Sequence, residues 1–421
     1  MGKKRTWLVG GVVAVVVLLV VGVGWWWLSD DSVLWTEEFQ VTDVLAASGD
    51  RAIVKVEDDR YPRILDLRNG DMGNGLQLRV HAVVSLDDTG SGLGWDGGGL
   101  VAWDARGRTV WWESAGNDGY VAAITPDTVV LNLCEGNYGD GGPATLVGLR
   151  RADGSEAWRG ESGCGEEWKS VPPVVVDVDE YPGRLRLLDA DTGAVVTDRP
   201  VAAATWSPGG QVIAHDGDEM WALSAEGREL WRTGRSASPC PGRYGIFGSL
   251  FYGVYPYVYC TSDGAGEVTA LIDPNSGDGR ELTVEPNEVS AIIGLGYLGD
   301  SVRLDEGEQD DPTRRWAITL EGDVLVAEDW MTGERQWTRE TGDLSCTGLT
   351  LPVDATWRYG TVLLHCGGED GGEPTDAWLL DFRTGEVVAH TARDEEDGLY
   401  PLPAARALVA RNGTTDLIGR G

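Results

Sequence analysis

The sequence predicts an all-β protein, and three observations indicate this fold class. The chain has 421 residues and 60 glycines, and it shows no long amphipathic helical pattern. A short turn motif recurs along most of its length at an average interval of 45 residues. An uncharged apolar stretch stands apart at the N-terminus. Recurrence every 40–50 residues or so, with several strands per unit, is typical of the blades of a β-propeller.

The first element is the apolar stretch of residues 7–28, WLVGGVVAVVVLLVVGVGWWWL, which contains no charged residue. At ~1.5 Å per residue, a helix of this length measures about 33 Å, which is enough to cross a bilayer. Three basic residues precede it, so the positive-inside rule places residues 1–6 in the cytoplasm and residues 32–421 outside. A cleaved signal peptide is the alternative, but no small-x-small cleavage site follows the stretch. We therefore expect an uncleaved, single-pass signal-anchor helix.

The turn motif is clearest in AEDWMTGERQW, residues 327–337. Asp329 can accept hydrogen bonds from turn amides, and Gly333 supplies the positive φ that a short hairpin loop needs. Trp337 carries a large apolar area and is expected to fill the seam between neighbouring blades. Eight copies of the motif occur, with turn glycines Gly70, Gly107, Gly154, Gly193, Gly227, Gly277, Gly333 and Gly385.

Only some copies end in the tryptophan, namely those with Trp111, Trp158, Trp231 and Trp337. The copies of Gly193, Gly277 and Gly385 lack it, so we expect their seams to be filled by other side chains. Eight copies predict eight blades, with seven as the alternative if one copy is an insertion. Propellers often close by joining N- and C-terminal strands in one blade, which removes exposed edges. The strand around Trp35 is therefore expected to complete a blade with residues 405–419.

The pattern Ala-x-Asp-x-x-Thr-Gly-x-x-x-Trp resembles the repeat of the pyrroloquinoline-quinone (PQQ)-type β-propellers. Residues 327–337 match it in full and the other copies match in part, over about residues 50–400. That family includes quinoprotein dehydrogenases and the non-enzymatic outer-membrane assembly propeller. The resemblance therefore implies the fold and leaves the function open.

A quinoprotein dehydrogenase would need PQQ on the propeller axis, calcium bound by carboxylate and amide side chains, and an Asp base. In many members a disulfide between adjacent cysteines also covers the quinone. This chain has no two adjacent cysteines and no C-x-x-C-H haem signal. It also lacks the G-x-S-x-G, P-loop and H-E-x-x-H motifs. We assign no catalytic, cofactor-binding or metal-binding residue, and PQQ with calcium stays as the alternative.

Six cysteines fit a location outside the cytoplasm. They are Cys134, Cys164, Cys240, Cys260, Cys346 and Cys366. Six cysteines allow 15 pairings, and the spacing here favours sequential ones. Each bridge would add about 2–4 kcal/mol to stability if unstrained. No pair has zinc-site spacing, and the four histidines are scattered along the sequence.

The formal net charge of −34 excludes nucleic acid as a partner, because the phosphate backbone would be repelled. Acidic loops such as DEGEQDDP (305–312) could hold divalent cations or meet a basic partner. Solvated surface is the simpler interpretation of such runs. Asp189 and Asp191 could likewise suggest a calcium loop, but they lie inside the repeat, where turn formation explains them better.

One aromatic run could bind a ligand. GIFGSLFYGVYPYVYC (245–260) places Tyr255, Tyr257 and Tyr259 on one face of a strand, because strand residues alternate. Such a face can form a platform for sugars or peptides. Packing between blades is the alternative, since large aromatic side chains mostly serve cores.

Together these features predict a cell-membrane protein with an extracytoplasmic β-propeller that acts as a non-catalytic binding or scaffolding module. Its partner would be an envelope protein or an extracellular ligand. A PQQ- and calcium-dependent oxidoreductase is the first alternative. An extracellular ligand sensor is the second, although a cytoplasmic tail of six residues leaves it little means of signalling alone.

Overall fold

The computed structural model describes residues 33–77, 79–114, 119–134, 143–163, 174–179, 183–206, 211–216, 219–234, 243–249, 256–262, 266–273, 275–282, 316–321, 323–329, 332–344, 355–358, 360–368, 372–392, 398–411 and 413–419. Among these residues no helix is long and apolar enough to cross a membrane. The anchor predicted over residues 7–28 and the tail over residues 1–6 lie outside the described ranges.

The described strands form nine sheets. In chain order, the first sheet contains β2 (Val41–Ser48), β3 (Arg51–Val56), β4 (Arg63–Asp66) and β5 (Met72–Gly75), and the second contains β6 (Ala82–Leu86), β7 (Gly92–Trp95), β8 (Gly99–Trp103) and β9 (Thr109–Ser114). The third sheet contains β10 (Gly119–Ile124), β11 (Thr128–Cys134), β12 (Pro143–Arg150) and β13 (Glu156–Gly163), and the fourth contains β14 (Val174–Asp179), β15 (Arg184–Asp189) and β16 (Val195–Pro200). The fifth sheet contains β17 (Ala203–Trp206), β18 (Val212–His215), β19 (Glu219–Leu223) and β20 (Glu229–Gly234).

The remaining four sheets follow in the same way. They are β21 (Arg243–Ser249), β22 (Pro256–Ser262), β23 (Gly266–Ile272) and β24 (Gly279–Leu282); β25 (Trp316–Glu321), β26 (Val324–Asp329) and β27 (Arg335–Glu340), which is followed by the 3-10 helix η3 (Thr341–Leu344); β28 (Ala355–Arg358), β29 (Thr361–Gly368), β30 (Gly372–Asp381) and β31 (Val387–Ala392); and β32 (Gly398–Leu402), β33 (Arg406–Arg411) and β34 (Thr414–Gly419) with β1 (Val33–Glu37). We call this last group the closing sheet.

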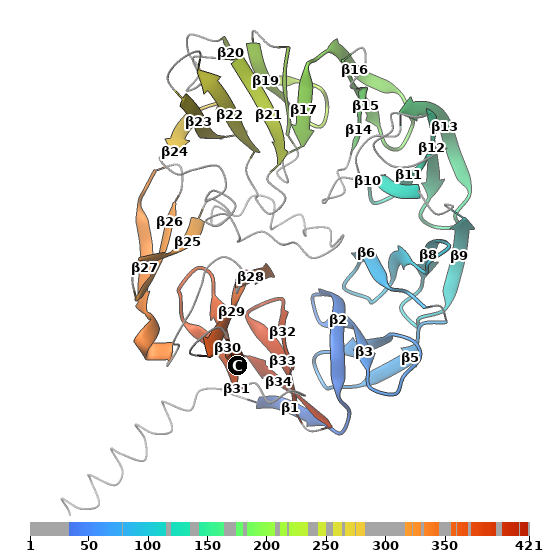
Figure 1. The fold of residues 1–421 in the computed structure, drawn as a ribbon. Helices are drawn as coiled ribbons and strands as arrows, with labels where there is room; N and C mark the ends of the chain where they lie inside the picture. Colours follow the sequence, from blue (N-terminus) through green and yellow to red (C-terminus); the bar gives the residue numbers. More distant parts are fainter. Residues whose placement is uncertain are drawn as a thin grey trace, which may run out of the picture.

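The sheets stand in a ring and follow one another around it in chain order (Figure 1). In the clearest sheets the first strand lies toward the centre and the last at the outer rim, as β6 and β9 show. The described chain is therefore an all-β propeller, as the sequence predicted.

The number of sheets differs from the eight blades expected. Each of the eight turn motifs lies between the last two strands of one sheet, and all eight turn glycines have positive φ. The ninth is the closing sheet, which contains no copy of the motif because its outer strand comes from the other end of the chain. Counting motifs alone therefore gives one sheet fewer than the described strands form.

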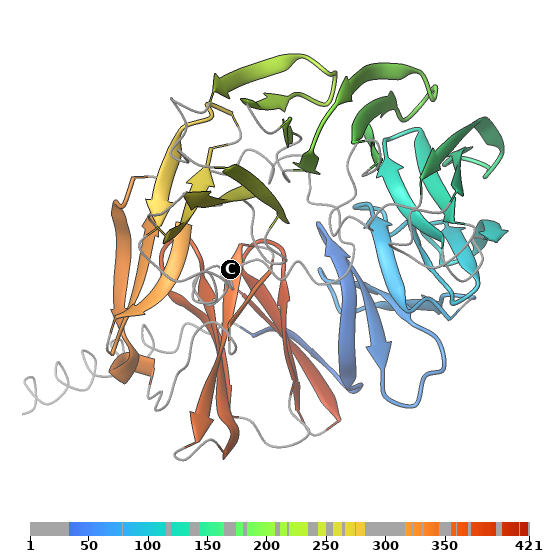
Figure 2. The same ribbon diagram turned by 45° about the horizontal axis from the view of Figure 1, so that its top comes forward.

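The closing sheet joins the two ends of the described chain. β1 pairs antiparallel with β34, and Trp35 lies opposite Leu417, which is the pairing the sequence predicted. Thr415 strengthens the junction, since its Oγ1 accepts a hydrogen bond from the Val41 amide at 3.0 Å and donates one to the Phe39 carbonyl at 2.7 Å. Both views place the N-terminal strand beside the C-terminal ones (Figures 1 and 2).

The hydrophobic core is divided among the seams between sheets. One cluster joins Leu100 of β8 to Ile124, Leu131 and Val147 of the next sheet, and another joins Leu325 of β26 to side chains of β29 and β30. Inner and middle strands are buried on both faces, so β8 is buried at all five positions. Outer strands alternate between exposed and half-buried residues, as β16 does.

Candidate functional site

The motif tryptophans lie in the seams, where each indole reaches the turn of the next sheet. The Nε1 of Trp111 donates to the Arg151 carbonyl at 2.8 Å, and that of Trp158 donates to the Ala190 carbonyl at 2.8 Å. Trp337 donates to the Phe382 carbonyl at 2.9 Å. Trp35 of β1 makes the same contact with the Leu67 carbonyl at 2.9 Å, so the closing seam follows the rule of the others. A buried indole N–H needs such an acceptor.

A β-bulge in the outer strand aims each tryptophan at its seam. The register shifts by one residue just before Trp111, Trp158, Trp231 and Trp337. A bulge inserts one extra residue, here Val110 in β9, and so re-aims the side chain that follows. The extra residue lies at the outer rim, and the tryptophan lies against the neighbouring sheet.

The turn glycine is required twice, for its backbone angle and for the ring beside it. Gly193 has a φ of +70°, and a β-carbon placed on it would lie 2.7 Å from the ring of Trp158. Gly385 has a φ of +68° and would come within 2.6 Å of Trp337 in the same way. Any side chain there would strain the backbone and displace the indole.

The copies of Gly193, Gly277 and Gly385 lack a tryptophan of their own, yet an indole lies beside each of these turn glycines. These glycines are covered by Trp158, Trp231 and Trp337, which come from the preceding sheet. The tryptophan of one copy acts on the turn of the next copy, a relation between sheets that one repeat does not reveal.

The seam beyond β16 shows what replaces the tryptophan. Thr197 stands at the tryptophan position, and its Oγ1 donates to the Gly227 carbonyl at 3.4 Å. Arg199 adds an ion pair with Glu229 of β20 at 2.9 Å. The guanidinium groups of Arg232 and Arg199 hold the pKa of Glu229 at about 2.

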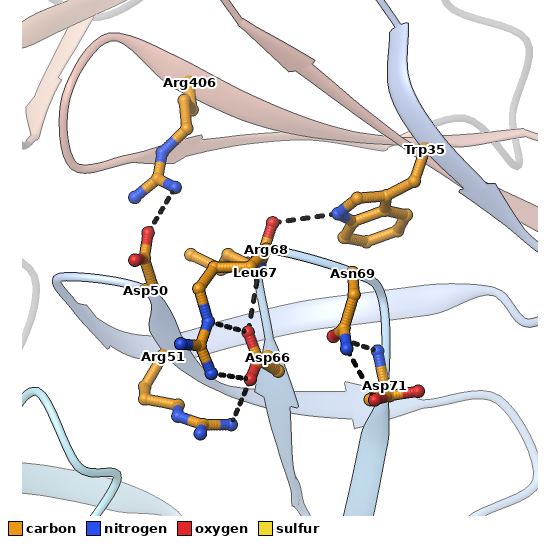
Figure 3. A network of polar contacts seen from close by, with 9 residues as sticks. All are labelled: Trp35, Asp50, Arg51, Asp66, Leu67, Arg68, Asn69, Asp71 and Arg406. Atoms are coloured by element: carbon orange, nitrogen blue, oxygen red, sulfur yellow. Dashed lines mark hydrogen bonds and ion pairs between the residues drawn. The ribbon is translucent and has the colours of Figure 1, made fainter.

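A polar network surrounds the turn at the closing seam (Figure 3). Asp66 accepts hydrogen bonds from the backbone and side chain of Arg68, and its Oδ2 lies 2.9 Å from Nη1 of Arg51. These contacts, chiefly the side-chain hydrogen bond from Arg68, lower the pKa of Asp66 to about 2. Arg406 of β33 reaches across the seam to Asp50 at 2.8 Å. The network ties one turn to its neighbours and thus has a structural role.

Asp189 and Asp191 stabilise a turn, as the sequence indicated. The Oδ1 of Asp189 accepts the amides of Asp191 at 3.1 Å and of Thr192 at 2.8 Å. Asp191 accepts the hydroxyl of Thr125 from the preceding sheet at 2.6 Å. Within the described ranges, no group of three His, Cys, Asp or Glu residues is placed to hold a metal ion.

The outer rim carries an apolar surface that the motif analysis missed. In β9, Val110 is 50% exposed and Trp112 is 47% exposed, while Trp111 between them is buried. The Nε1 of Trp112 donates to Oδ2 of Asp96 at 3.0 Å. The signal was present in the sequence as the pair Trp111-Trp112, because neighbouring strand residues point to opposite faces and cannot both enter one seam.

Comparison with known proteins finds only remote similarity, and only among solved structures. No protein-family model and no curated protein sequence matches the chain. Among solved structures, BamB from Moraxella catarrhalis is 16% identical with a TM-score of 0.36, and the match covers 80% of this chain and 95% of BamB. Quinohemoprotein alcohol dehydrogenase from Comamonas testosteroni is 11% identical with a TM-score of 0.38, and the match covers 94% of this chain and 77% of the dehydrogenase. Sqt1 from Saccharomyces cerevisiae is 10% identical with a TM-score of 0.39, and the match covers 93% of this chain and 99% of Sqt1.

The predicted tyrosine platform is described in part. Tyr255 is not among the described residues. Tyr257 and Tyr259 lie on β22, where they pair with Leu271 and Thr269 of β23. Their role in binding stays a prediction.

The cysteines are described in part. Cys134, the last residue of β11, is disulfide-bonded. Cys260 lies on β22 and Cys366 on β29. Cys164, Cys240 and Cys346 lie outside the described ranges, so the three sequential pairings stay predictions.

Proposed function

We propose that this protein is a non-catalytic binding or scaffolding module, a β-propeller that presents its outer surface to a partner in the cell envelope. The observation that carries the proposal is the exposed pair of Val110 and Trp112 on the outer strand β9. Tryptophan is enriched among the residues that dominate binding energy at protein interfaces. A large apolar side chain held at the rim of a rigid ring suits recognition of another molecule.

The seams support this proposal because they fix the outer strands. Each indole contact joins two sheets through a hydrogen bond and a buried ring. A partner that docks on such a surface loses little free energy to ordering it. The predicted anchor over residues 7–28 would hold the ring at the extracytoplasmic side of the cell membrane.

The proposal is tested on the full-length chain in the cells that express it. A photo-crosslinking amino acid is placed in turn at Val110, Val195 and Leu230, which are exposed on three different outer strands. We expect a discrete crosslinked product from at least one position. We also expect the protein to stay with membranes after carbonate washing and the ring to be cut by protease added outside.

The alternative function has a separate readout. Purified protein is heated with and without PQQ and calcium, and its absorption spectrum is recorded. A cofactor band with a higher melting temperature would replace the binding proposal with the oxidoreductase, because a ligand that binds only the folded state stabilises it. Absence of every crosslink at all three positions would also overturn the binding proposal.

A further inference from the structure

The outer strand β9 has an unpaired edge. It ends the strand order β6-β7-β8-β9 and pairs, among the described strands, with β8 alone. An edge strand offers a row of backbone N–H and C=O groups to any extended segment that approaches it. Proteins usually block this pairing with charged residues on the edge.

β9 combines exposed apolar side chains with a single charge, a combination that it shares with β1 (VLWTE) but not with the outer strands β13, β16 and β27. Its sequence TVWWES contains one charged residue, Glu113, whereas β13 (EAWRGESG) and β27 (RQWTRE) contain three each. The exposed valines of β16 differ as well, because that strand carries Asp198 and Arg199 in ion pairs with Arg184 and Glu229.

Trp112 is held in place before any partner arrives. Asp96 fixes the indole N–H, and the same carboxylate accepts the amides of Gly98 and Gly99 at 3.1 Å through Oδ1. A β-carbon on Gly99 would lie 3.0 Å from the indole of Trp112. One side of the ring thus lies against the β7–β8 turn, and the exposed remainder is fixed in one orientation. Binding there costs little side-chain entropy.

We propose that β9 accepts an extended, basic segment of a partner protein as an additional strand. Alternate residues of such a strand would contact Val110 and Trp112, and its backbone would bond to the free edge. The basic character follows from charge complementarity, because the chain carries a net charge of −34. A second copy of the chain would bring the same negative charge and be repelled. This inference rests on the proposed binding function and names its surface and partner chemistry.

The test uses the full-length protein in detergent and a fluorescein-labelled peptide of about eight residues that alternates valine and lysine, a typical strand length. A peptide alternating valine and glutamate is the matched probe. We expect the basic peptide to bind about tenfold more tightly than the acidic one. We also expect it to slow amide hydrogen exchange in residues 109–114, because added strand pairing protects the edge.

Three variants localise the effect. Val110→Lys and Trp112→Ala should each weaken binding of the basic peptide about tenfold, a loss of roughly 1.4 kcal/mol. Val195→Lys adds the same charge to the exposed edge of β16 and should change affinity less than about twofold. Melting temperatures confirm that each variant is folded.

The proposal is overturned if the acidic peptide binds equally well, if protection appears on another outer strand, or if Val195→Lys weakens binding as much as Val110→Lys. A dimer of the free chain that Val110→Lys dissociates would also overturn it, because β9 would then pair with itself. If crosslinking at Val195 or Leu230 captures a partner while β9 binds no peptide, the scaffolding function stands and only this surface is wrong.

Discussion

At the scale of single residues, the turn glycine and the tryptophan of the preceding sheet form one unit. Gly154 and Gly193 both combine positive φ with an indole packed against the α-carbon. The Asp and Gly positions were predictable from local turn chemistry, because those contacts span a few residues. The tryptophan's partner was not predictable, because Trp35, Trp111 and Trp337 bond to carbonyls 32, 40 and 45 residues away.

Replacing Gly193 with alanine should therefore cost stability in two ways. The left-handed backbone angle costs about 1–2 kcal/mol for a residue with a β-carbon, and displacing Trp158 adds about 1–3 kcal/mol. Gly360→Ala is the matched control, since Gly360 has a φ of +72° and open space around it. Denaturant unfolding of both variants measures the difference. Equal losses of unfolding free energy in the two variants would show that the indole contact contributes nothing to stability.

His215 gives a second prediction at this scale. Its side chain is buried at the end of β18, and burial lowers its pKa below 6.5 despite the nearby Asp216. The unfolded chain therefore binds more protons than the folded one as pH falls below about 6.5, so stability decreases in that direction. Thermal unfolding between pH 7 and pH 5 should show this decrease in the wild type and a smaller one in His215→Asn. His81→Asn, at an exposed histidine, is the control for loss of an imidazole outside the core.

At the scale of elements, the bulge in an outer strand lets that strand contribute one side chain to the buried seam and another to the exposed rim. The residue after the bulge enters the seam, and the bulged residue stays at the rim, as Trp111 and Val110 do in β9. Sequence periodicity predicts the strand but not the bulge, because the extra residue shifts the alternation by one. The rim surface of Trp112 was missed because the motif includes only the first tryptophan of the pair Trp111-Trp112.

The hydrogen bonds that Asp66 accepts make the stability of the turn depend on pH. The pKa of Asp66, about 2, lies below the ordinary 3.8, so the folded state binds fewer protons between these values. The stability that Asp66 contributes is present above pH 4 or so and is lost as pH falls toward about 2. Asp66→Asn should lower the free energy of unfolding by up to about 2 kcal/mol at pH 7, with the difference vanishing near pH 2.

The control for this measurement is Asp59→Asn. Asp59 pairs with Arg63 at 2.6 Å, but both side chains are about a third exposed. Such a pair contributes about 0–1 kcal/mol. If Asp59→Asn lowers the free energy of unfolding as much as Asp66→Asn does, the turn network stabilises the fold no more than an exposed ion pair.

At the scale of the whole molecule, the ring depends on one junction between distant parts of the chain. The propeller class and the closing pair of strands followed from the repeat and from the surplus strands at each end. The ninth sheet did not follow from the motif count, because a sheet built from both ends of the chain has no motif of its own.

Deleting residues 400–421 should sharply lower the melting temperature of the region 32–421. The deletion removes β33, β34 and the last three residues of β32, exposes the apolar side chains around Leu65 that they cover, and leaves β1 without its partner. Calorimetry of the intact and shortened chains measures the change. A melting temperature within a few degrees of the intact value would show that closure is not needed for stability.

The place of β1 also determines how the molecule bears force. A pull on the chain at residue 32 enters the ring through β1, whose first residue, Val33, lies opposite Ile418. Tension directed along β1 loads all its hydrogen bonds to β34 together, whereas tension directed across it breaks them one after another from Val33 onward. The force needed to separate β1 from β34 therefore depends on the direction of the pull. A pull across β1 would open the ring at this junction before it disrupts any other sheet.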